Sequence, residues 1–179
     1  MSAADKLYEI YTDDSGAFSV GMIHAQNSED ILFRGVDEEG KVSAYYAMPR
    51  KAILSMEEDT EYLARISAYM DYAAEHPYSA WYSLPDLEID PEKPILSQIL
   101  RLAAKDGELV SMGRVGDEEI ICGYVSEPAG GRVTVDCVDP ASAMDLPQVR
   151  IRIRDLEYVE YGSLANRLLM YANKKLGGR

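Results

Sequence analysis

The chain has few of the residue types that usually carry catalysis or bind metals. Its 179 residues include two cysteines, two histidines and one tryptophan. His24 and His76 stand far apart, without the H-x-x-x-H spacing or the nearby cysteine that zinc sites use. The sequence also lacks a G-x-x-x-x-G-K phosphate loop and a G-x-S-x-G nucleophile elbow. We therefore expect a non-enzymatic protein with no cofactor and no metal site.

Long apolar runs and a cysteine framework are missing as well. Cys122 and Cys137 are the only cysteines, which favours two small buried side chains in a reducing compartment over a disulfide. No apolar run approaches the roughly 20 residues that cross a bilayer. The start, MSAADKLYEIY, lacks the basic and apolar segments of a signal peptide. These absences predict a cytoplasmic protein that has no membrane partner.

Basic residues are scarce, with 18 Lys and Arg against 31 Asp and Glu and a net charge of −13. This balance argues against a protein that coats nucleic acid, because such binding depends on cations that displace counterions from phosphates. The imbalance lies in the first half, since residues 1–90 carry 18 acidic and 6 basic residues and residues 91–179 carry 13 and 12. The acidic clusters lack the D-x-D-x-D-G spacing of a calcium loop, so we expect solvated turns at Asp13-Asp14, 37–39, 57–59 and 117–119.

Hydrophobic periodicity indicates a mainly β first half. Ser2 and Asp5 are typical of a helix start, and the spacing of Leu7 and Ile10 predicts a short helix that ends before Gly16. Alternation of apolar and polar residues then predicts four strands, at 17–25, 30–36, 41–48 and 52–56. From Thr60 to His76 the period changes to about 3.6, which predicts a helix that covers these strands.

The same order of periodicities begins again at Pro94, with a helix that ends at Asp106-Gly107 and a strand over 108–115. At an offset of 92 residues Leu7 falls on Ile99 and Gly21 on Gly113. Later in the chain Leu156–Val159 falls on Ile53–Met56, and the stretch 164–172 repeats the helix at 62–70. Preserved order predicts an internal duplication, with units at 1–76 and 94–179 joined by a linker at 77–93.

The linker is rich in proline, which makes it semi-rigid. It also carries the apolar residues Tyr78, Trp81, Tyr82 and Leu84. One interpretation is an aromatic latch that docks the two units together, and the other is a platform for a peptide or a base.

The run VRIRIRD at 149–155 is the most distinctive local feature. Strand alternation would place Val149, Ile151 and Ile153 toward the core and would line up Arg150, Arg152 and Arg154 on the outer side. This predicts a candidate anion or partner site at the three arginines. The stripe could keep an edge strand from aggregating, meet the acidic first half of the same or another subunit, or meet RNA phosphates. The preceding loop, 140–147, is a candidate binding loop.

Each unit consists of a helix, a strand with a central glycine, a bent strand, a hairpin that turns at a glycine, and a last strand of the form Ile-x-x-Met or Leu-x-x-Val. Ile151-Arg152 stands shortly before Leu156–Val159, similar to the end of the second Sm motif. This order resembles the small barrel of the Sm and LSm proteins, and a generic SH3-like barrel would look much the same.

The resemblance implies a mainly β, α+β chain with two tandem Sm-like or SH3-like small β-barrels, each with an N-terminal and a C-terminal helix. It also implies pairing of barrels edge to edge into rings or pseudo-rings. The RNA site of the family is not matched, because its base-gripping Asn falls near Ile31 and Ile120, and the Gly after the motif's Arg is Ile153 in one unit and Lys51 in the other.

Two functions follow as expectations. The first is a non-enzymatic interaction or adaptor protein in which tandem barrels associate through strand edges as a homo-oligomer and offer an acidic surface to a protein partner. The alternative is a degenerate LSm-like RNA-binding protein that uses Arg150, Arg152 and Arg154, although the acidic charge disfavours RNA. An enzyme would require a site assembled between subunits.

Overall fold

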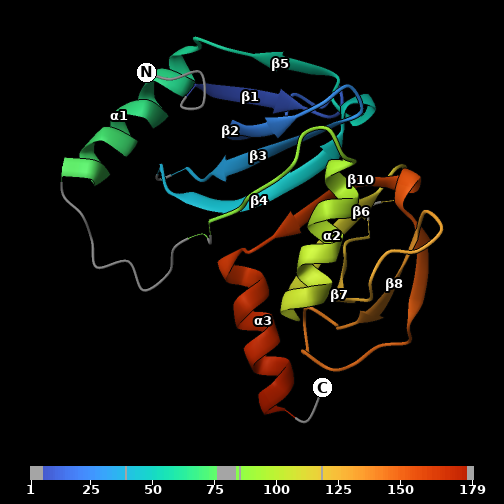
Figure 1. Ribbon diagram of the computed structural model, residues 1–179. Helices are drawn as coiled ribbons and strands as arrows, with labels where there is room; N and C mark the ends of the chain where they lie inside the picture. Colours follow the sequence, from blue (N-terminus) through green and yellow to red (C-terminus); the bar gives the residue numbers. More distant parts are fainter. Residues whose placement is uncertain (1–5, 39, 76–83, 85, 118, 177–179) are drawn as a thin grey trace.

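The computed structural model describes residues 6–38, 40–75, 84, 86–117 and 119–176. These residues form ten β-strands, three α-helices and two 3-10 helices (Figure 1). In chain order they are β1 Leu7–Tyr11, β2 Ser19–Gln26, β3 Asp30–Val36, β4 Val42–Pro49, η2 Arg50–Ala52, β5 Ser55–Glu57, α1 Glu61–Glu75, α2 Ile95–Asp106, β6 Leu109–Arg114, β7 Ile121–Val125, β8 Arg132–Cys137, β9 Val149–Arg152, η3 Ile153–Asp155, β10 Leu156–Tyr161 and α3 Leu164–Lys175.

All ten strands belong to one antiparallel sheet in the order β5-β1-β2-β3-β4-β10-β6-β7-β8-β9. The mainly β, α+β class predicted from the sequence is therefore confirmed. The sheet joins β4 of the first half directly to β10 of the second half, where Ala47 lies opposite Val159 and Tyr46 opposite Glu160. The strands β5 and β9 stand at the two ends of the order.

The short helix predicted before Gly16 is wrong for the residues described, because Leu7–Tyr11 is the strand β1. This strand pairs with β2 on one side and with β5 on the other. Leu7 and Ile10 are both buried, which produced the helical spacing, but they enter two different hydrophobic clusters. A strand with apolar residues on both faces has no period of two, so its pattern could be mistaken for one turn of helix.

The two halves have the same strand order and the same pairing register. The first half has the order β5-β1-β2-β3-β4, and the second has β10-β6-β7-β8-β9. Leu7 lies opposite Met22, and the residues 102 positions later, Leu109 and Tyr124, lie opposite one another. After β3 the offset is 103, as Ile31 opposite Met48 corresponds to Val133 opposite Ile151. The 3-10 helices η2 and η3 follow the same offset.

The offset of 92 predicted for the start of the repeat is therefore wrong, since it placed β1 on the helix α2. Gly21 corresponds in register to Gly123 and not to Gly113. In the later part of the repeat, where the sequence placed Leu156–Val159 on Ile53–Met56, the predicted offset equals the observed one.

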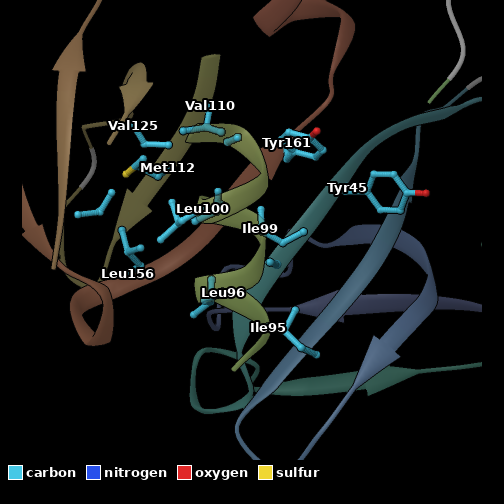
Figure 2. Packing of buried hydrophobic residues seen from close by; sticks show 14 of the residues in the cluster. Tyr45, Ile95, Leu96, Ile99, Leu100, Val110, Met112, Val125, Leu156 and Tyr161 are labelled. Atoms are coloured by element: carbon cyan, nitrogen blue, oxygen red, sulfur yellow. The ribbon is translucent and has the colours of Figure 1, made fainter. Parts of the chain in front are cut away.

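Helix α2 lies across the junction of the two halves and packs against β3 and β4 on one side and β7 and β10 on the other. Figure 2 shows Ile95 and Ile99 on the side of α2 that faces the first half, and Leu96 and Leu100 directed toward the second. All four side chains are buried. The main cluster joins them to both halves through Leu32, Tyr45, Ala47, Val110, Met112, Val133, Leu156 and Val159. The predicted units at 1–76 and 94–179 thus share a core, and their division into domains stays a prediction.

The other two helices each cover one half (Figure 1). On α1, Leu63 and Ile66 pack against Leu7, Val20 and Met22, as the helical period predicted. Helix α3 packs against β6. It begins at Ser163, whose hydroxyl accepts a hydrogen bond from the Asn166 amide at 3.2 Å. On its inner face Asn173 is fully buried and donates to the Ala143 carbonyl and the Asp145 carboxylate.

Part of the predicted linker can be followed. Tyr78, Trp81 and Tyr82 lie outside the described residues, whereas Leu84 and Ile89 pack against the main core and Leu87 belongs to it. His24 contacts this segment through an Nε2 to Leu87 carbonyl distance of 2.7 Å. Among the helices described, none has the length and apolar character needed to span a bilayer. Cys122 and Cys137 are buried free thiols, and burial raises the pKa of both.

Candidate functional site

The three arginines singled out in the sequence do not form one stripe. Arg150 and Arg152 are exposed on strand β9, but the strand ends at Arg152 and Arg154 lies in η3. The expected line of all three arginines along one strand is therefore wrong, because the chain turns in η3 before it enters β10. The Asp155 carboxylate forms ion pairs with both neighbouring guanidiniums, with Arg152 Nε at 2.6 Å and Arg154 Nε at 3.8 Å from its oxygens.

Arg152 and Arg154 line a hollow of about 820 Å³ that lies where the two halves meet. The β4–β5 corner of the first half also lines it, through Arg50 and Lys51. Arg132 at the start of β8 lines it beside the Gly130-Gly131 turn, and the β2–β3 turn and the start of α2 complete the lining. The hollow is thus built from five separate stretches of chain, which the fold brings together.

The two 3-10 corners that form the hollow occupy corresponding places in the two halves. They also touch, because the Lys51 ammonium donates a hydrogen bond of 3.0 Å to the backbone carbonyl of Arg154. Arg50 is fixed on the other side by the β2–β3 turn, where its guanidinium donates to the Asn27 carbonyl at 2.6 Å and to the Gln26 side-chain amide oxygen. Both cations are therefore held in place by neutral acceptors.

Asp30 is the one buried acid at this site. Its carboxylate accepts a hydrogen bond from the Leu96 amide at 3.3 Å, so it caps the N-terminus of α2 across the junction. Burial raises the pKa of Asp30, and the amides of Leu96 and Ile95 oppose that change. The partial positive charge of the helix end is thus already matched by a side chain.

The hollow is basic within an acidic protein. Five of its lining residues are basic and two, Glu29 and Asp30, are acidic, whereas the chain as a whole carries −13. Sequence reasoning found Arg152 and Arg154 but missed Arg50, Lys51 and Arg132. The correct repeat offset of 103 would have pointed to two of these three residues, because it aligns Arg50-Lys51 with Ile153-Arg154 in the arginine run.

The free edges of the sheet form a second surface with an asymmetric charge. Strand β9 exposes Arg150 and Arg152 at one end of the strand order. Strand β5 exposes Ser55 and Glu57 at the other end and is followed directly by Glu58 and Asp59. Lys6 forms ion pairs with Glu58 at 2.8 Å and Asp59 at 3.7 Å, so it offsets part of this negative charge. One edge is basic and the other is acidic.

Within the described part of the chain no three His, Cys, Asp or Glu side chains gather in a way that could hold a metal ion. His24 contacts the Leu87 carbonyl and lies edge-on to the Tyr45 ring. These contacts give His24 a structural role. No family model matches the sequence, and the comparisons with curated proteins and with solved structures likewise found no match.

Proposed function

We propose that this chain is a non-enzymatic interaction protein, built from two tandem small β-barrels of Sm-like plan, whose copies pair head to tail through β9 and β5. In this assembly the first half offers its acidic surface to a protein partner, as its excess of Asp and Glu suggests.

The repeated register supports the two-barrel plan. In each half the fifth strand returns to pair with the first, and a 3-10 corner separates the fourth strand from the fifth. Shifts in register between Ile23 and Ala25 and between Gly35 and Val36 mark bulges in the first half. Bulges bend strands and increase their twist, which is how a short sheet curves toward a barrel.

The internal junction is the observation that carries the proposal. Strand β4 pairs with β10 inside the chain, while their counterparts β9 and β5 stand at the ends of the sheet. The same junction can therefore form between two copies. When the register of β4 with β10 is transferred to β9 and β5 by the offset of 103, Arg150 lies opposite Met56 and Val149 lies opposite Glu57. The basic edge of one copy then meets the acidic edge of the next, and repetition closes a ring or extends a filament.

Cysteine cross-linking tests this register. A Met56→Cys chain mixed with an Arg150→Cys chain is expected to form an intermolecular disulfide under mild oxidation, because directly opposed Cβ atoms lie within about 4.5–5.5 Å. The matched control is Ser55→Cys mixed with Arg150→Cys, since a shift of one residue turns the side chain to the other face of the sheet. Equal yields from both mixtures, measured on non-reducing gels, would contradict the proposed register.

Light scattering tests association itself. The unmodified chain is expected to have a mass above the monomer at tens of micromolar, and Arg150→Glu is expected to weaken association roughly fivefold, because it adds a like charge beside Glu57 and Glu58. A chain that remains monomeric at high concentration would overturn the proposal.

RNA binding by the three arginines remains the alternative proposal. It is less favoured than head-to-tail pairing, because Arg154 has left the strand and Arg152 is paired with Asp155. Salt-sensitive binding of single-stranded RNA that Arg152→Glu abolishes would support it.

A further inference from the structure

We propose that the hollow between the two halves is a binding site for a compact ligand that carries adjacent phosphate groups. Such a site goes beyond head-to-tail assembly, because all of its lining residues belong to one copy of the chain. The hollow of about 820 Å³ lies within the range of roughly 300–1,000 Å³ that is usual for small-molecule sites.

The hollow has an excess of positive charge, with five basic residues against two acidic ones in its lining. Arg50 donates to a backbone carbonyl and to a side-chain amide oxygen. Lys51 donates to a backbone carbonyl. Neutral acceptors orient a cation but leave its charge in place. Arg152 and Arg154 share the single carboxylate of Asp155. The site is therefore rich in positive charge whose geometry is already set, which lowers the entropic cost of binding an anion.

The hydrogen-bond donors of the hollow suit phosphate groups. Four of the five basic residues are arginines, and the planar guanidinium can donate two parallel hydrogen bonds to one phosphate. The turn at Gly130 and Gly131 stands beside them with φ of +57° and +70°. A Cβ at either glycine would meet nothing within 4 Å, so the backbone of this turn is open to a ligand.

The basic side chains converge on one hollow from several elements. The cations come from η2, from the start of β8 and from the β9–η3 turn, and they surround one hollow rather than follow a line. This arrangement suits a ligand that concentrates its charge. An extended acidic peptide spaces its side chains at about 3.3 Å per residue on alternating faces and would present few of them to the hollow.

A single-stranded nucleic acid is less favoured. None of the described residues that line the hollow is aromatic, and stacking on aromatic rings is what usually holds unpaired bases. The net charge of −13 also opposes the approach of a long polyanion more than that of a small one.

Calorimetric titration with tripolyphosphate and with ATP tests the proposal. We expect saturable binding of tripolyphosphate at low salt that weakens as salt is raised. The double variant Arg132→Gln/Arg154→Gln, which removes two exposed cations of the lining, is expected to weaken binding at least about tenfold. Equal affinities for the two probes would identify the phosphates as the whole of the recognised chemistry, whereas tighter ATP binding would add a nucleoside contact.

Two matched variants sharpen the result. Arg101→Gln removes an exposed arginine of α2 that does not line the hollow, and it should change the affinity by less than about twofold. Asp30→Asn keeps a side chain that can cap α2 but removes the negative charge, and it should tighten binding. The proposal is overturned if neither probe binds at low salt, or if Arg132→Gln/Arg154→Gln binds as well as the unmodified chain. It is also overturned if only single-stranded RNA or an acidic peptide binds.

Discussion

Replacement of Ile99 by alanine is expected to destabilise the entire chain by roughly 2–5 kcal/mol, the usual cost of deleting most of a buried aliphatic side chain. Ile99 is fully buried on α2 and belongs to the core shared by the two halves. Figure 2 places its side chain between the helix and the strand that carries Tyr45. Because one cluster joins the halves, we expect a single cooperative transition in urea that moves to lower concentration.

Leu168→Ala provides the control for this prediction. Leu168 lies on α3 and is 54% exposed, so its truncation should change the free energy of unfolding by less than about 0.5 kcal/mol. Circular dichroism and tyrosine fluorescence should report the same midpoint for each variant. Two separate transitions, with only one of them affected by Ile99→Ala, would mean that the halves fold independently and that α2 does not couple them.

The regular parts of the fold could be predicted from the sequence because their patterns are local. The strand at 30–36 and the helix that ends at Asp106 before Gly107 have the predicted bounds. Gly107 has φ of +66°, the conformation expected of a glycine that ends a helix. Strand β1 could not be recognised in the same way, because its buried residues serve two clusters and a buried acid, Glu9, stands between them.

The repeat illustrates a different limit. Few residues are identical between the halves, so an alignment of apolar residues can slide by ten positions without losing its plausibility. Backbone pairing has no such freedom, because a slip of one residue would turn every side chain to the other face of the sheet. The strand pairing therefore identifies the offset of 102 to 103, which the amino-acid sequence alone does not.

The candidate site could be predicted only in part for the same reason. Arg152 and Arg154 belong to a conspicuous run, whereas Arg50, Lys51 and Arg132 are isolated in the sequence and meet them only after the sheet has formed. The 3-10 corner at Ile153 decides the outcome, because it directs Arg154 toward the hollow and away from the line of β9.

Replacement of Gly123 by alanine is expected to destabilise the protein by roughly 1–3 kcal/mol or more, the range for overpacking of a well-packed interior. A Cβ at this position would overlap the Asp136 carbonyl oxygen and would lie 2.8 Å from Val135 Cγ1. The obstacle includes backbone of the paired strand β8, so β7 and β8 would have to separate. Thermal unfolding followed by circular dichroism measures the effect.

Gly21→Ala is expected to be similarly costly, because Gly21 holds the corresponding position in the first half. Its Cβ would lie 2.9 Å from the Arg34 carbonyl oxygen and would overlap the fully buried ring of Phe33. Ser19→Ala, an exposed position in the same strand, should change the free energy of unfolding by less than about 0.5 kcal/mol. If either glycine variant were as stable as Ser19→Ala, the close approach of strands would not be a shared requirement of the halves. Comparable losses at both glycines would support one strand-packing solution used twice.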